Sequence, residues 1–474
     1  MAKKMRGIFP LILLLACLQP ARAQQFALYN TRTLFDAFEN PAQKAFMADS
    51  SRKYAFNFLV PNFAVTASAK GPAQPNIRYL AFTGKVNSEG LEVGNTERNK
   101  VSANSNNYLA MFRVFKDVKY NREFGFAWQL RSDNFADVTN ESIAVLKNYQ
   151  SLSAADIADP FNNRVLSQTY HQFSFSYRED VTKRLGLGVK LSYLSGVLYN
   201  DLDIKSSDFD INTAANTYTL HLKGKYRSNF STEEPESLAA MPGFQNPGAA
   251  LTIGMNYKLR HGWFVLANVK DIGFIRWNNA SYNYVFDKPL TIDNASAPDS
   301  YNRLVKKLGT FISKEYELHG FTSMINSKAE VLINKDLGNY QPNLLLSKSL
   351  LTPDMDIALI NNLKYKNSVF SIAADYNPNR YFQLGGQYML KSPNFEFFIG
   401  SDQLFTTYYF TKGMLTEDEN IGKKNTGASF YLGFSAKFGA PMEHQANASR
   451  IPGINSDLDR PGIFKRFLSK KNRK

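Results

Sequence analysis

Cysteine is nearly absent from this sequence: Cys17 is the only one among 474 residues, which excludes a disulfide framework. Motifs of catalysis are missing as well. The five histidines include no pair spaced for zinc hydrolysis, and neither a Gly-x-Ser-x-Gly elbow nor a phosphate-binding glycine loop occurs. His171 and Ser174 are three residues apart, and residues at that spacing on a strand face opposite sides. We therefore expect no catalytic residue, no metal site and no cofactor.

Long apolar runs are missing after residue 23, where no window reaches the roughly 18 apolar residues of a membrane-spanning helix. If the mature chain crosses a membrane, it must therefore do so with strands that close into a barrel. The formal net charge is +15, but the basic residues are spread along the chain instead of lining one stripe. Nucleic acid is therefore not an expected partner.

The first residues have the pattern of a cleavable secretory signal peptide. Lys3, Lys4 and Arg6 precede an apolar stretch over residues 8–18, and Ala21-Arg22-Ala23 forms a small-x-small cleavage site. The apolar stretch is too short to span a bilayer. An alternative interpretation is a lipobox, Leu14-Leu15-Ala16-Cys17, with Cys17 lipidated. The better-formed site favours cleavage after Ala23, which would remove Cys17.

The chain is rich in segments that alternate with a period of two residues. Leu185, Leu187, Val189, Leu191 and Tyr193 share one face of such a segment, opposite Gly186, Gly188, Lys190 and Ser192. Similar segments begin at Glu123, Gly248 and Ser429. One face is large and apolar and the other mixes glycine with charge, which is typical of strands between lipid and a polar lumen.

Each alternating segment is about 9 to 13 residues long, like a tilted membrane strand, whereas strands of soluble proteins average about 5 to 6. A soluble β-sandwich with one wet face would explain the alternation but not this length. The sequence therefore predicts an all-β fold, a closed antiparallel transmembrane β-barrel of about 14–16 strands with small helical insertions. Further strand candidates include residues 54–69, 77–84, 355–364 and 404–411.

We expect four regions: a signal peptide over 1–23, a plug or mouth segment over 24–50, an outer-membrane barrel over 51–439 and a basic periplasmic tail over 440–474. In the second region Leu34, Phe35 and Phe38 suit a short helix that Asn40-Pro41 ends. Two excursions, 134–166 and 288–326, contain predicted helices near Asn140 to Tyr149 and near Ser300 to Glu315.

Several short segments, taken in their order along the chain, form a recognisable pattern. They are Leu28-Tyr29-Asn30 with Asn40-Pro41-Ala42, residues 190–196, residues 271–277, and Ser401-Asp402. Together they resemble a Bacteroidota family of outer-membrane proteins of unknown function, which looks related to the FadL-like and PorP/SprF-like barrels. The resemblance covers most of residues 24–439. It implies a barrel with an N-terminal segment at the periplasmic mouth and supplies no ligand.

The residues of these segments indicate structure more than chemistry. Asn40-Pro41 suits the turn from a plug segment into the first strand, because Asn before Pro starts turns. Gly196 and Gly273 suit strand-end turns.

The larger side chains allow two interpretations each. Trp277, near a strand end, suits an interfacial anchor better than a ligand contact. Asp271 and Asp402 either face the lumen or, as we favour, are solvated or hydrogen-bonded carboxylates at strand ends. Lys190 lies on the glycine-rich face, which is predicted to line the lumen.

Two functions are compatible with these features, both in contact with outer-membrane lipid. The first is a conduit or binding barrel for a small hydrophobic molecule, which rests on the polar lumen face, the plug-like segment and the resemblance. The second is a structural or secretion-associated barrel that docks periplasmic or surface proteins, which rests on the two excursions, the basic tail and the resemblance to accessory secretion barrels. A lumen blocked by side chains, with the excursions packed outward, would favour the second function, whereas a continuous pocket under residues 24–50 would favour the first.

The end of the chain changes character after a polar, turn-rich stretch. Pro461 suits a first helical turn, and Phe464, Phe467 and Leu468 would share one face of a helix. The candidate contact residues of this tail are Lys465, Arg466, Lys470 and Lys471, which suit an inner-leaflet surface or an acidic periplasmic partner. A disordered solubilising tail is the alternative, because so short a helix is marginal alone.

Overall fold

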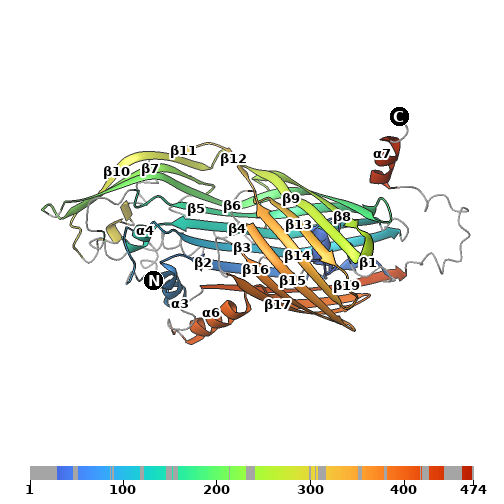
Figure 1. Ribbon diagram of the computed structural model, residues 1–474. Helices are drawn as coiled ribbons and strands as arrows, with labels where there is room; N and C mark the ends of the chain where they lie inside the picture. Colours follow the sequence, from blue (N-terminus) through green and yellow to red (C-terminus); the bar gives the residue numbers. More distant parts are fainter. Residues whose placement is uncertain are drawn as a thin grey trace, which may run out of the picture.

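The computed structural model describes residues 29–45, 52–85, 90–94, 96–117, 122–145, 159–212, 214–230, 241–297, 302–304, 316–350, 355–377, 382–416, 426–441 and 462–471, with a few isolated positions between them. Over these residues the chain forms a closed antiparallel β-barrel with fourteen strands in its wall (Figure 1). The predicted fold class is confirmed. The expected signal peptide, the alternative lipobox and residues 442–461 of the tail lie outside the described residues.

The wall is built from strands in chain order: β1 (Arg52–Phe56) and β2 (Phe63–Lys70), β3 (Asn99–Asp117), β4 (Arg122–Val138), β5 (Arg164–Asp180), β6 (Leu185–Asn212), β8 (Pro247–Lys258), β9 (Trp263–Trp277), β12 (Phe321–Met324) and β13 (Lys328–Lys335), β14 (Tyr340–Ser349), β15 (Met355–Tyr365), β16 (Ser368–Tyr376), β17 (Gln383–Ser392), β18 (Phe395–Ser401) and β19 (Thr426–Pro441). β1 and β2 occupy one position, because both pair with β19 and with β3. β12 and β13 likewise share a position beside β9. The pairing of β19 with β1 and β2 closes the sheet.

The two ends of the barrel differ. At one end residues 200–212 of β6 pair with β7 (Thr217–Ser228), which pairs with β10 (Tyr282–Ile292), which pairs with β11 (Glu317–Leu318). These strands extend beyond the wall at the left of Figure 1, where α4 (Asn140–Ala144), part of the connection from β4 to β5, also lies. At the other end the connections are short, as in the hairpin that pairs Tyr365 with Ser368.

The predicted orientation of the alternating side chains is confirmed. Ile253 of β8 is on the outer face and 54% exposed. A Cβ added at Gly188, Gly254 or Gly433 would collide with residues inside the barrel. The glycine-rich face therefore points into the lumen, as its mixture of glycine and charge indicates.

β9 changes face part-way along its length. Its register with β8 shifts between Leu251 and Ile253, and Asp271 has a left-handed φ of 57°. Because of this bulge, the consecutive residues Lys270 and Asp271 are both buried inside. An extra residue in one strand moves every later side chain to the opposite face.

This bulge and the packing around it correct two predictions. Trp277 is not an interfacial anchor: it is fully buried, and its indole Nε1–H donates to Ser323 Oγ at 2.8 Å. Gly196 and Gly273 are not strand-end turns, because they lie within β6 and β9. A Cβ at Gly196 would come within 2.7 Å of the Trp277 ring, so close packing explains that glycine.

Two strand candidates are helices instead. Residues 77–83 belong to α3 (Gln74–Thr83), which has a proline in its first turn and is capped at its end by Gly84, with a φ of 68°. Residues 404–411 belong to α6 (Leu404–Thr416), an apolar segment that lies outside the wall (Figure 1). Short apolar segments without clear periodicity suit either element, and here packing decides.

The remaining helices follow the sequence more closely. The short helix expected before Asn40 is α2 (Leu34–Glu39), and α4 (Asn140–Ala144) begins the helix predicted from Asn140. The helix predicted near Ser300 to Glu315 falls mostly on residues that the structure does not describe. The tail contains α7 (Ile463–Lys471). Among the described residues, none of the helices combines the length and apolar character needed to cross a membrane.

Candidate functional site

Residues 29–45 run through the interior of the barrel. Thr33 caps the start of α2, because its hydroxyl accepts a hydrogen bond from the Asp36 N–H, and Asn40 caps the end of the helix. Leu34, Phe35 and Phe38 are each at most 3% exposed. They pack against side chains of the inner face, namely Tyr108, Met111, Ala127, Phe398 and Tyr431. Residues 29–45 therefore lie inside the wall and are not a part of it.

Glycines of the inner face let this segment approach the strands. Pro41 lies so close to β6 at Gly188 that a Cβ there would collide with the Pro41 carbonyl group. A Cβ at Gly254 of β8 would be 3.2 Å from the Cβ of Ala42. Gly188 is close to the short connection between β5 and β6, so the segment lies near the end of the barrel that has short connections.

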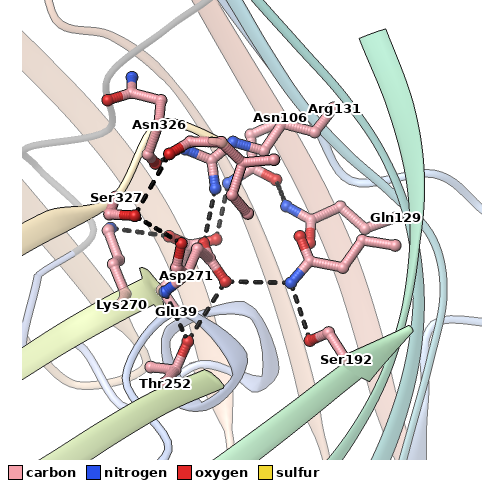
Figure 2. A network of polar contacts seen from close by, with 12 residues as sticks. Glu39, Asn106, Gln129, Arg131, Ser192, Thr252, Lys270, Asp271, Asn326 and Ser327 are labelled. Atoms are coloured by element: carbon pink, nitrogen blue, oxygen red, sulfur yellow. Dashed lines mark hydrogen bonds and ion pairs between the residues drawn. The ribbon is translucent and has the colours of Figure 1, made fainter. Parts of the chain in front are cut away.

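Asp271 is the centre of a buried polar network (Figure 2). One carboxylate oxygen of Asp271 is 2.6 Å from Arg131 Nη1, and the other is 3.2 Å from Lys190 Nζ. The Gln172 amide and the Thr252 hydroxyl also donate to this carboxylate, at 3.0 and 3.2 Å. Asp271 thus faces the lumen as a fully partnered charge, and it lies within β9 rather than at a strand end.

Glu39 connects α2 to the same network. Its carboxylate is 2.9 Å from Lys270 Nζ, and it accepts hydrogen bonds from Tyr108 OH at 2.8 Å and from the Asn106 amide at 2.6 Å. Lys270 also lies 3.0 Å from Glu330. Burial alone would raise the pKa of Glu39, but the ammonium groups of Lys270 and Lys190 outweigh it and lower the pKa to about 2. Glu39 is therefore ionised at neutral pH.

The start of α2 is attached to the opposite side of the wall. Lys391 Nζ donates to the carbonyl oxygen of Arg32 at 2.6 Å, and the Leu34 N–H donates to Glu396 at 2.6 Å. A carboxylate is favourable at a helix N-terminus, where backbone N–H groups lack helical partners. Burial raises the pKa of Asp36 to about 7, although the N–H groups of Arg32 and Thr31 lower it.

A further set of contacts holds the residues that follow α2. Arg178 Nε donates to the Ala42 carbonyl at 2.8 Å, and Arg113 Nη2 donates to the Ala37 carbonyl at 3.1 Å. Lys44 pairs with Asp180 at 2.9 Å. Residues 29–45 are thus attached by charged side chains to strands around much of the barrel.

The structure brings together some of the residues singled out in the sequence. Lys190 and Asp271 form an ion pair in the network, and Asn40 and Pro41 follow Glu39, which contacts Lys270 in the same network. Asp402, in contrast, lies away from this network beyond the end of β18, where its N–H donates to Ser429 Oγ.

The other sequence candidates also lie apart from the network. Gly196, Gly273 and Trp277 form a separate buried packing layer. Lys465, Arg466, Lys470 and Lys471 all lie in α7, which is outside the wall.

Sequence reasoning missed most of the charged residues of the site, which include Glu39, Arg113, Arg131, Arg178, Lys270, Glu330, Lys391 and Glu396. A signal exists for some of them, because Arg131 lies on the less apolar face of its alternating strand, as Lys190 does. Lys270 gives the same signal, because it alternates with the buried residues Leu266 and Asn268 before the bulge of β9. Within the described residues, no three His, Cys, Asp or Glu side chains are grouped in a way that could hold a metal ion.

His171 and Ser174 lie on opposite faces of β5, as their spacing predicts. The Ser174 hydroxyl contacts Ser192 inside the barrel at 2.8 Å, whereas His171 Nδ1 accepts a hydrogen bond from the indole of Trp128. The two side chains therefore do not form a catalytic pair.

Comparison with protein-family models gives a match over residues 50–402. The chain belongs to DUF5723, a family of unknown function. No curated protein matches it. Among solved structures, it is similar to a ΔS2S3 mutant of the monoaromatic hydrocarbon channel TodX, with 8% identity, a TM-score of 0.44 and coverage of 89% of this chain and 98% of that one.

The toluene transporter TodX of Pseudomonas putida is similar at 7% identity, with a TM-score of 0.40 and coverage of 88% of this chain and 94% of that one. At such low identities and TM-scores, the substrates of these channels do not carry over to this member of DUF5723.

Proposed function

We propose that this DUF5723 protein is an outer-membrane barrel that acts as a gated conduit or binding barrel for a small hydrophobic molecule, with residues 24–50 as its plug. The observation that carries the proposal is the position of residues 29–45, which cross the lumen and are attached to the wall by ion pairs and hydrogen bonds as well as by the apolar packing of α2. Buried ion pairs contribute little net stability, because desolvation offsets their attraction. A segment held in this way can be well positioned and still be displaced.

The outer face supports a location in a membrane. Large apolar side chains are exposed on neighbouring strands, among them Ile372, Phe370 and Leu359, which are 63%, 49% and 48% exposed. α6 adds Phe405, Tyr408 and Leu415 outside the wall. Exposed apolar area of this extent is unfavourable in water and favourable against lipid.

The connections indicate which way the barrel is inserted. Outer-membrane barrels have short periplasmic turns and longer extracellular loops. Because residues 29–45 lie near the end with short connections, the plug would be at the periplasmic side. This agrees with the N-terminal mouth segment that the sequence resemblance implies.

The inner face contains a strip that suits an apolar ligand. Leu266, Leu332, Leu345 and Ala358 are directly paired neighbours across β9, β13, β14 and β15, and all are buried. Tyr29 of the plug packs against this cluster. Displacement of the plug would uncover an apolar strip beside the charged network, which is the reason for proposing a hydrophobic molecule as the ligand.

A reducible cross-link between plug and wall tests the proposal. The variant Lys44→Cys/Asp180→Cys places cysteines at two positions whose native side chains meet at 2.9 Å, and a short bis-maleimide linker that contains a disulfide joins them. We expect the cross-linked barrel to be closed in a liposome-swelling assay and the barrel with a reduced linker, like a variant lacking residues 26–38, to admit small solutes faster. Lys44→Cys treated with the same linker is the matched control. Equal swelling of the deleted and cross-linked forms would contradict gating by the plug.

The ligand requires a separate measurement. The protein purified from membranes in mild detergent should carry a small hydrophobic molecule, detectable by native mass spectrometry, and Leu345→Asp should lose it while the barrel remains folded. Equal recovery of the molecule from both proteins would indicate that it is bound at the outer face.

A second function, docking of surface proteins, is supported by the sheet of β7, β10 and β11. This sheet has its own core, which includes Leu220, Phe286 and Ile292, yet Val285 is 83% exposed. A photo-reactive amino acid at Val285 should then give an adduct of one defined mass in intact cells, and the same group at Ile372 should not. Adducts with lipid alone at both positions would contradict docking.

A further inference from the structure

A carboxylate on the outer face of the barrel is covered by the C-terminal helix. In the last residues of β5, Arg178 points inward to Ala42, so Tyr177 and Glu179 point outward. Glu179 is nevertheless 0% exposed. α7 lies over it, outside the wall and at the end with short connections (Figure 1).

The first turn of α7 is bonded to this carboxylate. The Lys465 N–H donates to Glu179 Oε1 at 2.9 Å, and the Phe464 N–H donates to Oε2 at 3.3 Å. The rings of Tyr177 and Phe464 are 5.5 Å apart. A buried carboxylate needs such donors, and the first N–H groups of a helix need an acceptor. Glu179 therefore caps the N-terminus of α7 and fixes where the helix begins.

Most apolar side chains of α7 remain exposed beside this contact. Phe467 is 73% exposed, Ile463 is 53% exposed and Leu468 is 45% exposed. The sequence of the same helix supplies the basic residues Lys465, Arg466, Lys470 and Lys471. The outer face of the wall nearby is also apolar, with Phe175 at 53% exposed and next to Phe124, which contacts Tyr177.

We propose that α7 is an interfacial helix that lies on the inner leaflet of the outer membrane, with Phe467 and its apolar neighbours among the acyl chains and its basic residues at anionic phospholipid headgroups. A short helix with one apolar face and a cationic remainder binds a bilayer surface in this way. The exposed residues of α7 continue the apolar outer face of β4 and β5, which faces lipid in the proposed membrane location. Lipid is therefore the partner that we assign to them. The inference rests on the proposed membrane location but not on gating by the plug.

The position of residue 467 can be measured directly. A cysteine at Phe467, in a chain without Cys17, is labelled with an environment-sensitive fluorophore and reconstituted in vesicles of phosphatidylethanolamine and phosphatidylglycerol that contain shallow brominated lipid. We expect at least threefold quenching at position 467. A label at Val285, on the sheet that extends beyond the wall, should show little, and it serves as the matched control.

Two variants separate the contribution of the Glu179 cap from that of the basic residues of α7. Glu179→Ala should release the helix, so that trypsin cleaves within residues 465–471 at least tenfold faster, and Glu179→Gln, which keeps an acceptor, should restore much of the protection. Lys465→Glu/Arg466→Glu should lower the quenching at least twofold in these vesicles and leave it unchanged in phosphatidylcholine vesicles. Each sample is checked for heat-modifiable migration, which reports membrane insertion separately.

The proposal is overturned if label 467 is no more quenched than label 285 in barrels that have inserted. In that case the apolar residues of α7 belong to a protein partner or to water. If the barrels do not insert at all, it is the proposed membrane location that fails.

Discussion

Lys270 is the residue whose loss should most strongly release the plug. Its ammonium group lies between the carboxylates of Glu39 and Glu330, at 2.9 and 3.0 Å, and all three side chains are largely buried. Lys270→Met removes the one cation of this trio and leaves two neighbouring buried carboxylates. Removal of one partner from a buried ion pair costs about 3–5 kcal/mol. Since about 1.4 kcal/mol is a tenfold change in an equilibrium, the displaced plug should become at least about a hundredfold more populated.

A buried cysteine in α2 reports this population. Ala37 is 0% exposed, so Ala37→Cys reacts with a water-soluble maleimide only when the plug is displaced. In the background of Lys270→Met we expect labelling to be at least about a hundredfold faster. Lys223→Met is the matched control, because Lys223 and Asp287 form an exposed pair that contributes about 0–1 kcal/mol. It should change the labelling rate less than about fivefold.

A third variant separates loss of the plug from loss of the barrel. Glu39→Gln leaves Lys270 paired with Glu330 and should accelerate labelling less, because a hydrogen bond to a charged group contributes about 1.5–3 kcal/mol. Addition of Glu39→Gln to Lys270→Met should slow labelling again, because one of the two unpaired carboxylates is gone. A labelling rate in Lys270→Met within about threefold of the parent, in barrels that are still heat-modifiable, would refute a role of this network in holding the plug.

Three further outcomes are expected. Ile372→Arg should destabilise the barrel in liposomes by about 2–4 kcal/mol, as arginine does at lipid-facing sites near the middle of a bilayer. Val285→Arg, on the sheet that extends beyond the wall, should cost little. Equal costs of the two substitutions in a folding titration would contradict the proposed position of the bilayer around the wall. Because burial raises the pKa of Asp36 to about 7, docking of the plug should weaken as the pH rises from about 5 through 7. The labelling rate of Ala37→Cys is divided by that of an exposed cysteine at Val285, which removes the pH dependence of the thiol itself. This ratio should rise over that range and stay flat in Asp36→Asn, and an unchanged slope would exclude Asp36. Gly188→Val should displace the plug, because the added Cβ would collide with Pro41. Leu187→Val, on the outer face, should not displace it. Equal swelling rates of liposomes with the two variants would show that docking of the plug does not need the close approach of Pro41 to Gly188.

Much of the architecture follows from local patterns in the sequence. Alternation of large apolar residues with glycine and charge predicts which side chains of β6, β8 and β19 point inward, because a strand repeats every two residues wherever it lies. The short helix before Asn40 is equally local: Thr33 caps it, and its apolar residues lie on one side.

The candidate site is decided by tertiary structure. The ion pair of Glu39 and Lys270 joins residues 231 positions apart, and Lys270 and Asp271 both point inward because a bulge interrupts the alternation of β9. Sequence periodicity cannot reveal such a bulge, and past it every assignment of a face is reversed, as for Trp277. The position of α7 against Glu179 is likewise decided by tertiary structure. A single charged residue in an alternating strand has no local signal for its partner, because strand register and closure of the barrel decide which groups meet.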